Sequence, residues 1–217
     1  MQKSDVLLGG LPFRIERRFD SALSLTRPVS PEALELNLAA FERALLRNSP
    51  AESLAFLLKR ETGDALPASY RTELARTLRE GFKRLLAGDT SGAARAIKGR
   101  GFGLTPSGDD LLAGFLLGLN ALHKAFGLDV LKEVRTLRRA SRSRNVFSEA
   151  FLRCAAEGRF FEQAKVLAEA LFQGSEDEVR RACSRLSAVG ASSGADLSVG
   201  LLSALKLNAA RLQKVGA

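Results

Sequence analysis

The sequence is poor in the residues on which most metal and disulfide chemistry depends. Its 217 residues include two cysteines, Cys154 and Cys183, and a single histidine, His123. None of the three stands at the spacing of a zinc site, and two distant cysteines form no disulfide framework. We therefore expect a protein without a His/Cys metal centre and without structural disulfides.

Long apolar runs are missing as well. No window approaches the roughly 18 uncharged apolar residues that a transmembrane helix needs. The N-terminal apolar run is too short, before Arg14 and Glu16, to be a signal peptide. Hydrophobic residues make up 46% of the chain, an ordinary share that argues against extensive disorder. These features predict a soluble, cytoplasmic protein of one domain, or one domain with a small appendage, and no membrane partner.

Acidic residues are outnumbered, with 24 Asp and Glu against 33 Lys and Arg, a net charge of +9. The densest basic segment is residues 132–144, where Arg135, Arg138, Arg139 and Arg142 share one face of a helix. Such a segment raises nucleic acid as a partner. Stacking aromatics are scarce, because the chain has no Trp and one Tyr. We favour a solvated basic face, or general attraction of an anionic substrate or acidic partner, over a nucleic-acid site.

Two parts of the chain differ in their periodicity. In residues 1–28, apolar side chains such as Phe13 and Leu23 alternate with polar ones, and Gly9-Gly10 supplies a turn, which predicts short strands. Residues 29–217 have helical patterns, beginning with a Ser30-Pro31 helix start. Further helices are expected at about 51–60, 68–87, 109–126, 128–142, 146–157, 160–173, 176–187 and 195–213. The sequence predicts a mainly α, multi-helix domain with a small N-terminal β element.

Residues 98–110, KGRGFGLTPSGDD, break the helical pattern. Glycines allow positive φ and a close approach of backbone N–H groups to a ligand. Ser107 is predicted to be a helix N-cap, with Asp110 completing a capping box. Capping alone leaves the glycines and Asp109 unexplained. The glycine spacing is that of a P-loop, but Asp109 stands where a P-loop has its phosphate-binding lysine.

Residues 193–205 repeat the pattern of residues 107–119. Both read S-G-x-D-L-x-x-G and open an apolar helix. Glycine inside a helix costs about 1 kcal/mol relative to alanine, so the second glycine of each copy is expected to allow close helix packing. The sequence thus predicts an internal repeat of a Gly-rich loop plus helix. If the two helices pack together, Asp110 and Asp196 face each other across one pocket.

Such a pocket combines opposing electrostatic features. Helix N-termini and Arg100 attract anions, whereas Asp109, Asp110 and Asp196 repel them. The conflict resolves if Asp110 and Asp196 hold Mg²⁺ beside an anionic ligand, or if the carboxylates act as caps and general bases. Purely structural capping is the alternative, and no other cofactor is indicated.

Three segments resemble the AllH family. Residues 101–114, G-F-G-L-T-P-S-G-D-D-L-L-A-G, resemble the family's signature. Residues 145–158 resemble its S-x-x-x-L-x-x-A-x-x-G segment, and residues 190–196 its G-x-[ST]-S-G-x-D segment. The likeness extends over about residues 85–210. Members carry a longer, β-rich N-terminal part, so an altered or inactive site is one expectation for this chain.

The resemblance implies a subunit of oxamate carbamoyltransferase, which acts in anaerobic allantoin degradation together with other subunits. That activity exchanges a carbamoyl group between oxamate and phosphate, giving carbamoyl phosphate. We therefore expect a small anionic substrate and catalytic roles for Asp109, Asp110 and Asp196. The expected ligand-binding residues are Arg100, Gly101, Gly103, Thr105, Ser107, Gly108, Asn145, Ser148, Ser192, Ser193 and Gly194. The alternatives are a non-catalytic assembly subunit and a basic, helical nucleic-acid-binding protein.

Overall fold

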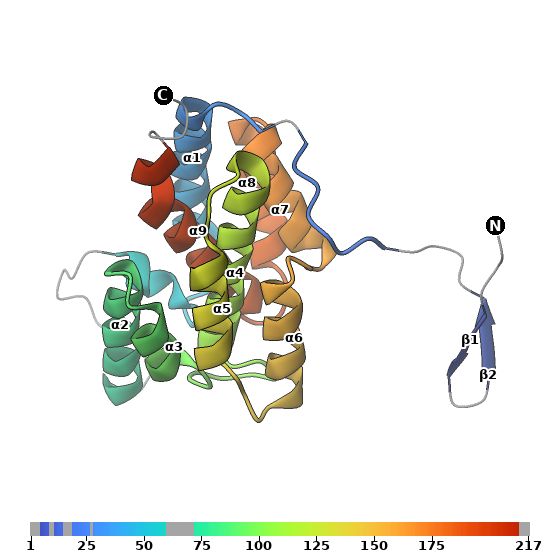
Figure 1. Ribbon diagram of the computed structural model, residues 1–217. Helices are drawn as coiled ribbons and strands as arrows, with labels where there is room; N and C mark the ends of the chain where they lie inside the picture. The colour runs from blue at the N-terminus through green and yellow to red at the C-terminus, as the bar shows by residue number, and fades with distance from the viewer. Residues whose placement is uncertain (1–4, 9–10, 15–18, 27, 60–71, 213–217) are drawn as a thin grey trace.

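A computed structural model describes residues 5–8, 11–14, 19–26, 28–59 and 72–212. This part of the chain contains nine α-helices, one 3-10 helix and one hairpin, so the predicted mainly helical class is confirmed (Figure 1). The helices are α1 (Pro31–Asn48), the 3-10 helix η1 (Leu54–Leu58), α2 (Thr72–Leu86), α3 (Thr90–Ile97), α4 (Ser107–Phe126), α5 (Leu131–Ala140), α6 (Val146–Ala156), α7 (Glu162–Gln173), α8 (Glu176–Ser187) and α9 (Ser193–Leu212). None of the described helices is long and apolar enough to cross a membrane.

The N-terminal strands form one antiparallel hairpin. Strand β1 (Asp5–Leu8) pairs with β2 (Leu11–Arg14). The predicted β-rich segment of residues 1–28 as a whole stays a prediction, because residues 1–4, 9–10, 15–18 and 27 lie outside the described ones. Later in this segment, the Leu23 N–H donates to the Gly158 carbonyl and the Phe160 N–H to the Ser21 carbonyl. The chain before α1 is therefore hydrogen-bonded to the α6–α7 connection.

The start of α1 follows the sequence prediction. Ser30 is the N-cap and accepts a hydrogen bond from the Ala33 N–H, and Pro31 is the first helical residue. The face expected to be apolar is buried, as shown by Leu34 and Phe41. Local capping chemistry and one apolar stripe were sufficient to place this helix.

Two elements differ from expectation. Residues 90–97 form α3, which is not among the expected helices. Asp89 is its N-cap and accepts a hydrogen bond from the Gly92 N–H. The helix expected at 51–60 is only the short 3-10 turn η1. Residues 60–71, which include the predicted start of the following helix, lie outside the described part of the chain.

Helices α4 and α9 form the centre of the bundle. All residues of α4 from Ser107 to Leu119 are buried, and so are those of α9 from Gly194 to Leu205. A helix buried on every side needs neighbours all round, and α4 contacts α3, α5, α6, α7 and α9. Figure 1 shows α4 in the middle of the helical body.

Close backbone approach joins these two helices, as the sequence predicted. A Cβ at Gly114 would overlap the carbonyl oxygen of Leu197, and a Cβ at Gly200 would overlap that of Leu111. The two contacts are reciprocal, since Gly114 and Leu111 occupy the same places in their copy of the pattern as Gly200 and Leu197 do in theirs. Glycine is therefore required at both positions by the packing.

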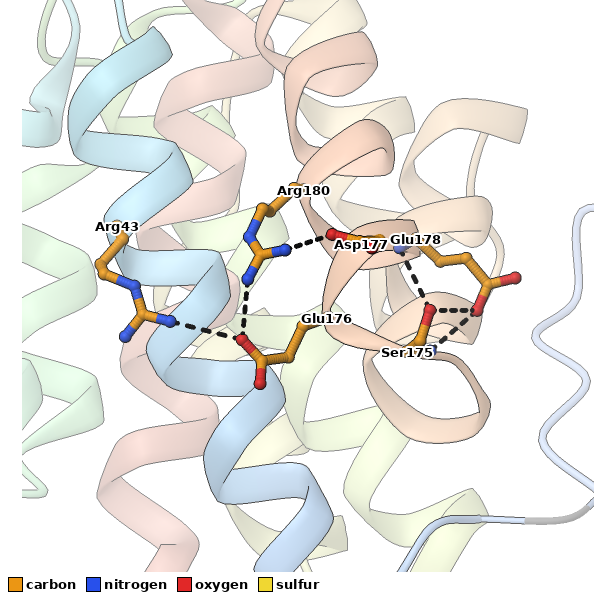
Figure 2. Close-up of polar contacts among 6 residues, drawn as sticks. All are labelled: Arg43, Ser175, Glu176, Asp177, Glu178 and Arg180. Atoms are coloured by element: carbon orange, nitrogen blue, oxygen red, sulfur yellow. Dashed lines mark hydrogen bonds and ion pairs between the residues drawn. The ribbon is translucent and has the colours of Figure 1, made fainter.

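Polar side chains fix the start of α8 against α1 (Figure 2). Ser175 and Glu178 form a capping box, in which the Glu178 carboxylate accepts from the Ser175 N–H at 2.8 Å. Glu176 accepts from Arg180 at 2.9 Å and pairs with Arg43 of α1 at 3.4 Å. These exposed pairs position α8, the helix that leads into the second S-G-x-D segment.

Candidate functional site

The glycine-rich loop between α3 and α4 has a left-handed backbone at several points. Gly101 has a φ of 106° and Gly103 a φ of 99°, values that L-residues rarely adopt. The loop is closed by a hydrogen bond of 2.8 Å from the Gly108 N–H to the Arg100 carbonyl. The glycines thus allow the chain to fold back onto the first turn of α4.

The predicted capping box at Ser107 is wrong. Ser107 is the first residue of α4, its N-cap is Pro106, and no side chain caps the helix. The first backbone N–H groups are satisfied locally, because those of Asp109 and Asp110 donate to the Pro106 carbonyl. The Ser107 side chain hydrogen-bonds Asp196 of α9 instead.

Asp110 and Asp196 make reciprocal contacts between the two motifs. Asp110 is hydrogen-bonded by the hydroxyl groups of Ser193 and Thr105. Asp196 interacts with Ser107 and accepts a hydrogen bond of 2.9 Å from the Ser192 hydroxyl. The serine of each motif therefore contacts the aspartate of the other, which places the two segments against each other rather than at separate ends of the protein.

The second oxygen of Asp196 has a partner that the sequence did not suggest. Its Oδ1 accepts a hydrogen bond of 2.6 Å from the Leu54 N–H, at the start of η1. A backbone N–H carries no residue-specific signal, and Leu54 lies 142 positions away along the chain. Long-range contacts of this kind become visible only in the folded structure.

Both carboxyl groups are shifted toward the protonated form. Burial raises the pKa of Asp110 to about 7, although the Ser193 and Thr105 hydrogen bonds oppose the rise. Burial likewise raises the pKa of Asp196 to about 6, against the hydrogen bonds from Leu54, Ser192 and Ser107. Loss of hydration disfavours the charged carboxylate, and the charge of Asp196 adds to the rise at Asp110. The pair is therefore able to exchange protons near neutral pH.

Asp109 has a different environment from Asp110. Its Oδ1 accepts a hydrogen bond of 2.8 Å from the Gly99 N–H, which holds the beginning of the loop. Its Oδ2 is buried and has no hydrogen-bond partner among the described residues, and the same is true of the Asp110 Oδ2. A buried carboxylate oxygen without a donor is costly. The Oδ2 atoms of Asp109 and Asp110 can therefore each accept a further hydrogen bond.

Of the two candidate residues at the start of α6, Asn145 contacts the loop. Asn145 caps α6 by accepting from the Phe147 and Ser148 N–H groups, and its Nδ2 donates to the Leu104 carbonyl at 2.9 Å. Ser148 is buried, and its hydroxyl oxygen has no hydrogen-bond partner within the described ranges. Asn145 therefore holds the loop against the start of α6.

Exposure divides the candidate residues into two groups. The side chains of Asp109, Asp110, Asp196 and Ser107 are at most 2% exposed. Apart from the buried Ser148, the other polar candidates lie nearer the surface: Arg100 is exposed, and Thr105, Asn145, Ser192 and Ser193 are half-buried. The Gly108 and Gly194 N–H groups donate to the Arg100 and Val189 carbonyls and do not point at a ligand. The hydroxyl groups thus separate the buried carboxyl groups from solvent.

No cluster of three or more His, Cys, Asp or Glu side chains that could hold a metal ion is present in the part of the chain that the structure describes. Asp110 and Asp196 face serine and threonine hydroxyls instead. A protonated carboxyl group is also a poor ligand, because Mg²⁺ prefers carboxylates. The geometry gives the Mg²⁺ alternative no further support.

The AllH family model, described as oxamate carbamoyltransferase subunit AllH, matches residues 97–205, half of the chain. The chain belongs to the AllH family. The matched region runs from the end of α3 into α9 and contains the glycine-rich loop, both S-G-x-D segments and α6. The resemblance found in the sequence is therefore confirmed. No curated protein and no solved structure matches the chain significantly.

The basic segment lies outside this cluster of hydroxyl and carboxyl groups. Its helix is α5, which ends at Ala140, so Arg142 does not share the helix face as predicted. All four arginines nevertheless line one groove, between α5 and α6. The groove contains no aromatic side chain on which a base could stack. The structure thus gathers the arginines without supplying the aromatic partners of a typical single-strand nucleic-acid site.

Proposed function

We propose that this AllH-family chain is a subunit of an oxamate-type carbamoyltransferase and binds a small anionic substrate where its two S-G-x-D segments meet. The observation that carries the proposal is the reciprocal contact of Ser107 with Asp196 and of Ser193 with Asp110. Both contacts lie within the region that defines the family. We treat the two segments with their helices as an internal repeat, whose copies contribute equally to one site.

The half-buried hydroxyl groups are the proposed substrate contacts. Thr105, Ser192 and Ser193 lie at the surface of the cluster and can turn toward a ligand. The exposed Arg100 carries a guanidinium group suited to a carboxylate or phosphate. Gly101 and Gly103 keep the loop free of side chains beside these groups. Together they supply donors for an anion without requiring the helix N–H groups, which are already satisfied.

Asp110 and Asp196 are the proposed positioning and proton-transfer groups. When phosphate attacks the carbamoyl group, a C–O bond forms, the C–N bond to oxamate breaks, and the leaving nitrogen needs a proton. A carboxyl group with a pKa of about 7 holds a proton in part at neutral pH and can give it up. Because Asp110 is buried, the proton would pass through the hydroxyl group of Ser193 or Thr105.

The assembly alternative is favoured by one observation. The three aspartates are at most 2% exposed, so a substrate does not reach them directly in the isolated chain. In that alternative the network is structural and the chain only positions a catalytic partner. Both possibilities require contact with other subunits, for which the surface beside the loop is suited.

That surface, which we term the loop–α6 patch, consists of exposed apolar side chains on the loop and the first turn of α6. Its members are Phe102, Leu104, Val146 and Phe147. Asn145 joins its two halves through the hydrogen bond to the Leu104 carbonyl. Large apolar side chains gathered at the surface are typical of protein–protein contacts. We propose that another carbamoyltransferase subunit covers the loop–α6 patch and closes the site.

The test is carbamoyl transfer measured with the partner subunits present. Loss of a general acid or base typically slows turnover by about 10²–10⁴-fold, and we expect this for Asp110→Asn and Asp196→Asn. The matched control is Glu52→Gln, an exposed carboxylate outside the cluster, with turnover unchanged. Unchanged turnover in both aspartate variants would remove the catalytic assignment.

Thermal unfolding separates a ligand-binding subunit from an assembly subunit. A ligand that binds only the native state raises the unfolding temperature. Oxamate or carbamoyl phosphate should therefore raise it for the parent chain but not for Ser193→Ala. If neither compound raises it for the chain alone or for the assembled subunits, the assembly alternative is correct.

A further inference from the structure

A groove of about 400 Å³ lies between α5 and the second half of α6. It is lined by Val134, Arg135, Arg138, Arg139, Arg142, Arg153, Ala156 and Glu157. Five guanidinium groups therefore converge on one concave surface that contains a single carboxylate. This volume is within the range of small-molecule sites, about 300–1,000 Å³.

One of the five arginines is already engaged and gives the groove its shape. Arg138 forms an ion pair with Glu149 of α6, and this lowers the pKa of the Glu149 carboxyl group. Glu149 also accepts a hydrogen bond of 2.9 Å from the Ser143 N–H, in the turn between the helices. The Arg138–Glu149 pair thus fastens α5 to α6 along one wall of the groove.

The other four guanidinium groups form no such ion pair, although the charge of Arg142 also helps to lower the pKa of the Glu149 carboxyl group. Arg135, Arg139, Arg142 and Arg153 are exposed, and within the described ranges none of their side chains makes a hydrogen bond or an ion pair. Glu157, the one acid in the lining, is 3.8 Å from Arg159 and is engaged with it. Four like charges around one cavity repel each other unless an anion lies among them.

A neighbouring basic cavity differs from the groove, because cations in its lining form hydrogen bonds within the protein. It lies between α3 and α5 and is lined by Ser91, Arg95, Lys98, Thr136, Arg139 and Ala140. The Lys98 ammonium donates to the Ala140 and Arg142 carbonyls at 3.1 and 3.2 Å, and Arg95 donates to Ser91. There Arg95 and Lys98 support the fold, whereas Arg139, which lines both cavities, remains available together with Arg135, Arg142 and Arg153 of the α5–α6 groove.

We propose that the α5–α6 groove binds a ligand with a diphosphate or longer phosphate chain. Guanidinium groups bind phosphate oxygens in pairs of parallel hydrogen bonds, and four free ones exceed what a single phosphate can use. Val134 and Ala156 give the groove an apolar floor on which the non-phosphate part of a nucleotide can lie. The phosphate chain belongs to a free polyphosphate or to a nucleotide, and this site is separate from the carbamoyl site proposed above.

The experiment is calorimetric titration of the full chain with pyrophosphate, ADP, AMP, inorganic phosphate and adenosine. Pyrophosphate and ADP are expected to bind at least about tenfold more tightly than AMP or inorganic phosphate, a factor that corresponds to about 1.4 kcal/mol. Adenosine should not bind detectably. Tighter binding of ADP than of pyrophosphate identifies a nucleotide site, and equal binding identifies a phosphate-chain site; both support the proposal.

The double variant Arg142→Gln/Arg153→Gln takes one cation from each wall and should weaken pyrophosphate binding at least about tenfold. Arg47→Gln on α1 removes an exposed arginine far along the chain and should leave binding unchanged. All three side chains are exposed, so an unchanged circular dichroism melting curve is expected for each variant. Equal weakening by Arg47→Gln, or no binding of any phosphate compound, overturns the proposal.

Macromolecular ligands are outcomes of the same titration. A single-stranded oligonucleotide or a polyglutamate peptide is added at equal charge concentration. If either binds more tightly than pyrophosphate and loses affinity in the double variant, the groove is a nucleic-acid or acidic-protein surface and the phosphate-chain proposal is wrong.

Discussion

At the scale of single residues, Asp110 and Asp196 combine burial with hydroxyl partners. Each carboxyl group is removed from water, which favours its protonated form, while hydroxyl and backbone donors favour the charged form. Burial prevails at both, since both pKa values rise from the ordinary 3.8 toward neutrality. A small change in pH near 6–7 therefore changes the charge of the network.

This shift makes the stability of the protein depend on pH. Between about pH 4 and 7 the native state keeps protons that the unfolded chain has released, so the free energy of unfolding falls as the pH rises. Each pKa unit corresponds to about 1.4 kcal/mol. In Asp110→Asn or Asp196→Asn one of the two titrating groups is gone, so the variant should lose less stability between pH 5 and pH 8 than the parent does. Urea unfolding at pH 5 and pH 8 measures the difference.

The exposed Glu52 provides the control for this pH series. Glu52→Gln removes a carboxylate that is exposed to solvent in the native state. Its unfolding free energies should follow those of the parent at both pH values. An equal decline between pH 5 and pH 8 in the parent and both Asn variants would contradict the raised pKa values.

Sequence reasoning succeeded in part at this scale. The spacing S-G-x-D in two places predicted that Asp110 and Asp196 approach each other, because each motif opens an apolar helix and such helices pack together. It did not predict that Ser107 leaves its own helix uncapped. From the sequence, the first N–H groups of the helix are the expected partners of a serine that precedes it. The carboxyl group of Asp196, which the Ser107 side chain contacts instead, comes close only in the folded structure.

At the scale of elements, the α4–α9 contact places the two motifs side by side. Backbone meets backbone at Gly114 and Gly200, so no side chain separates the helices there. If the backbones of α4 and α9 lay farther apart at either glycine, Ser107 would move away from Asp196 and Ser193 away from Asp110. The packing of two helices thus sets the geometry of the hydroxyl–carboxyl network.

Alanine at these positions should destabilise the fold. In Gly114→Ala or Gly200→Ala the new methyl group overlaps a carbonyl oxygen of the opposite backbone, which cannot rotate away. Overpacking of this kind costs about 1–3 kcal/mol or more, which outweighs the gain of about 1 kcal/mol in helix propensity. At about 2–4 °C per kcal/mol for a chain of this size, the unfolding temperature should fall by several degrees.

Gly81→Ala on α2 is the matched control, because its methyl group would meet side-chain atoms of Ile97 and Ala96. The Ile97 side chain can rotate and the Ala96 contact, at 3.2 Å, is milder, so the unfolding temperature should fall less than in Gly114→Ala. Equal changes in the two variants would show that helix propensity, and not the backbone contact, determines the effect.

Asn145 caps α6 and also hydrogen-bonds the glycine-rich loop, and two variants can separate the contributions of these interactions to stability. Asn145→Ala removes both the α6 cap and the bond to the Leu104 carbonyl, whereas Asn145→Asp keeps an acceptor for the cap and loses the donor. Loss of a cap costs about 1 kcal/mol, so the unfolding temperature should fall in the alanine variant and much less in the aspartate variant. A fall of equal size in both would assign the stability to the bond with Leu104 rather than to the cap.

The elements themselves were predicted unevenly, for identifiable reasons. α8 was expected at 176–187 and has these bounds, 12 residues in all. α3 was missed because its 8 residues are too few for a periodic pattern. The apolar pattern therefore revealed the longer helix and not the shorter one.

At the scale of the whole molecule, the arginine groove and the loop–α6 patch involve different parts of α6. The groove is lined by residues of its second half, whereas the patch contains exposed apolar side chains of its first turn. The net charge of +9 alone pointed toward nucleic acid. Its distribution favours instead a small polyanion at one place and a protein partner at another.

The contact with a partner subunit is the last prediction and belongs to this scale. Leu104 is 65% and Phe147 is 53% exposed, so in the isolated chain their substitution removes little packing. In Leu104→Ser/Phe147→Ser the unfolding temperature of the isolated chain should remain within about 1–2 °C of the parent value, because exposed substitutions change stability by about 0.5 kcal/mol. Binding to the other carbamoyltransferase subunits, measured by surface plasmon resonance, should weaken at least about tenfold, since truncating buried anchors of an interface costs more than about 1 kcal/mol each.

Leu36, at 61% exposure on α1, supplies the control for a general loss of surface hydrophobicity. Leu36→Ser removes an equally exposed leucine outside the loop–α6 patch, so it should leave subunit binding unchanged. If Leu36→Ser weakens binding as much as Leu104→Ser/Phe147→Ser, the partner does not recognise the loop–α6 patch. In that case the proposal that a partner subunit closes the site through the loop–α6 patch is wrong. If only the patch variant loses binding, the loop that carries Arg100 lies at the subunit interface, as that proposal requires.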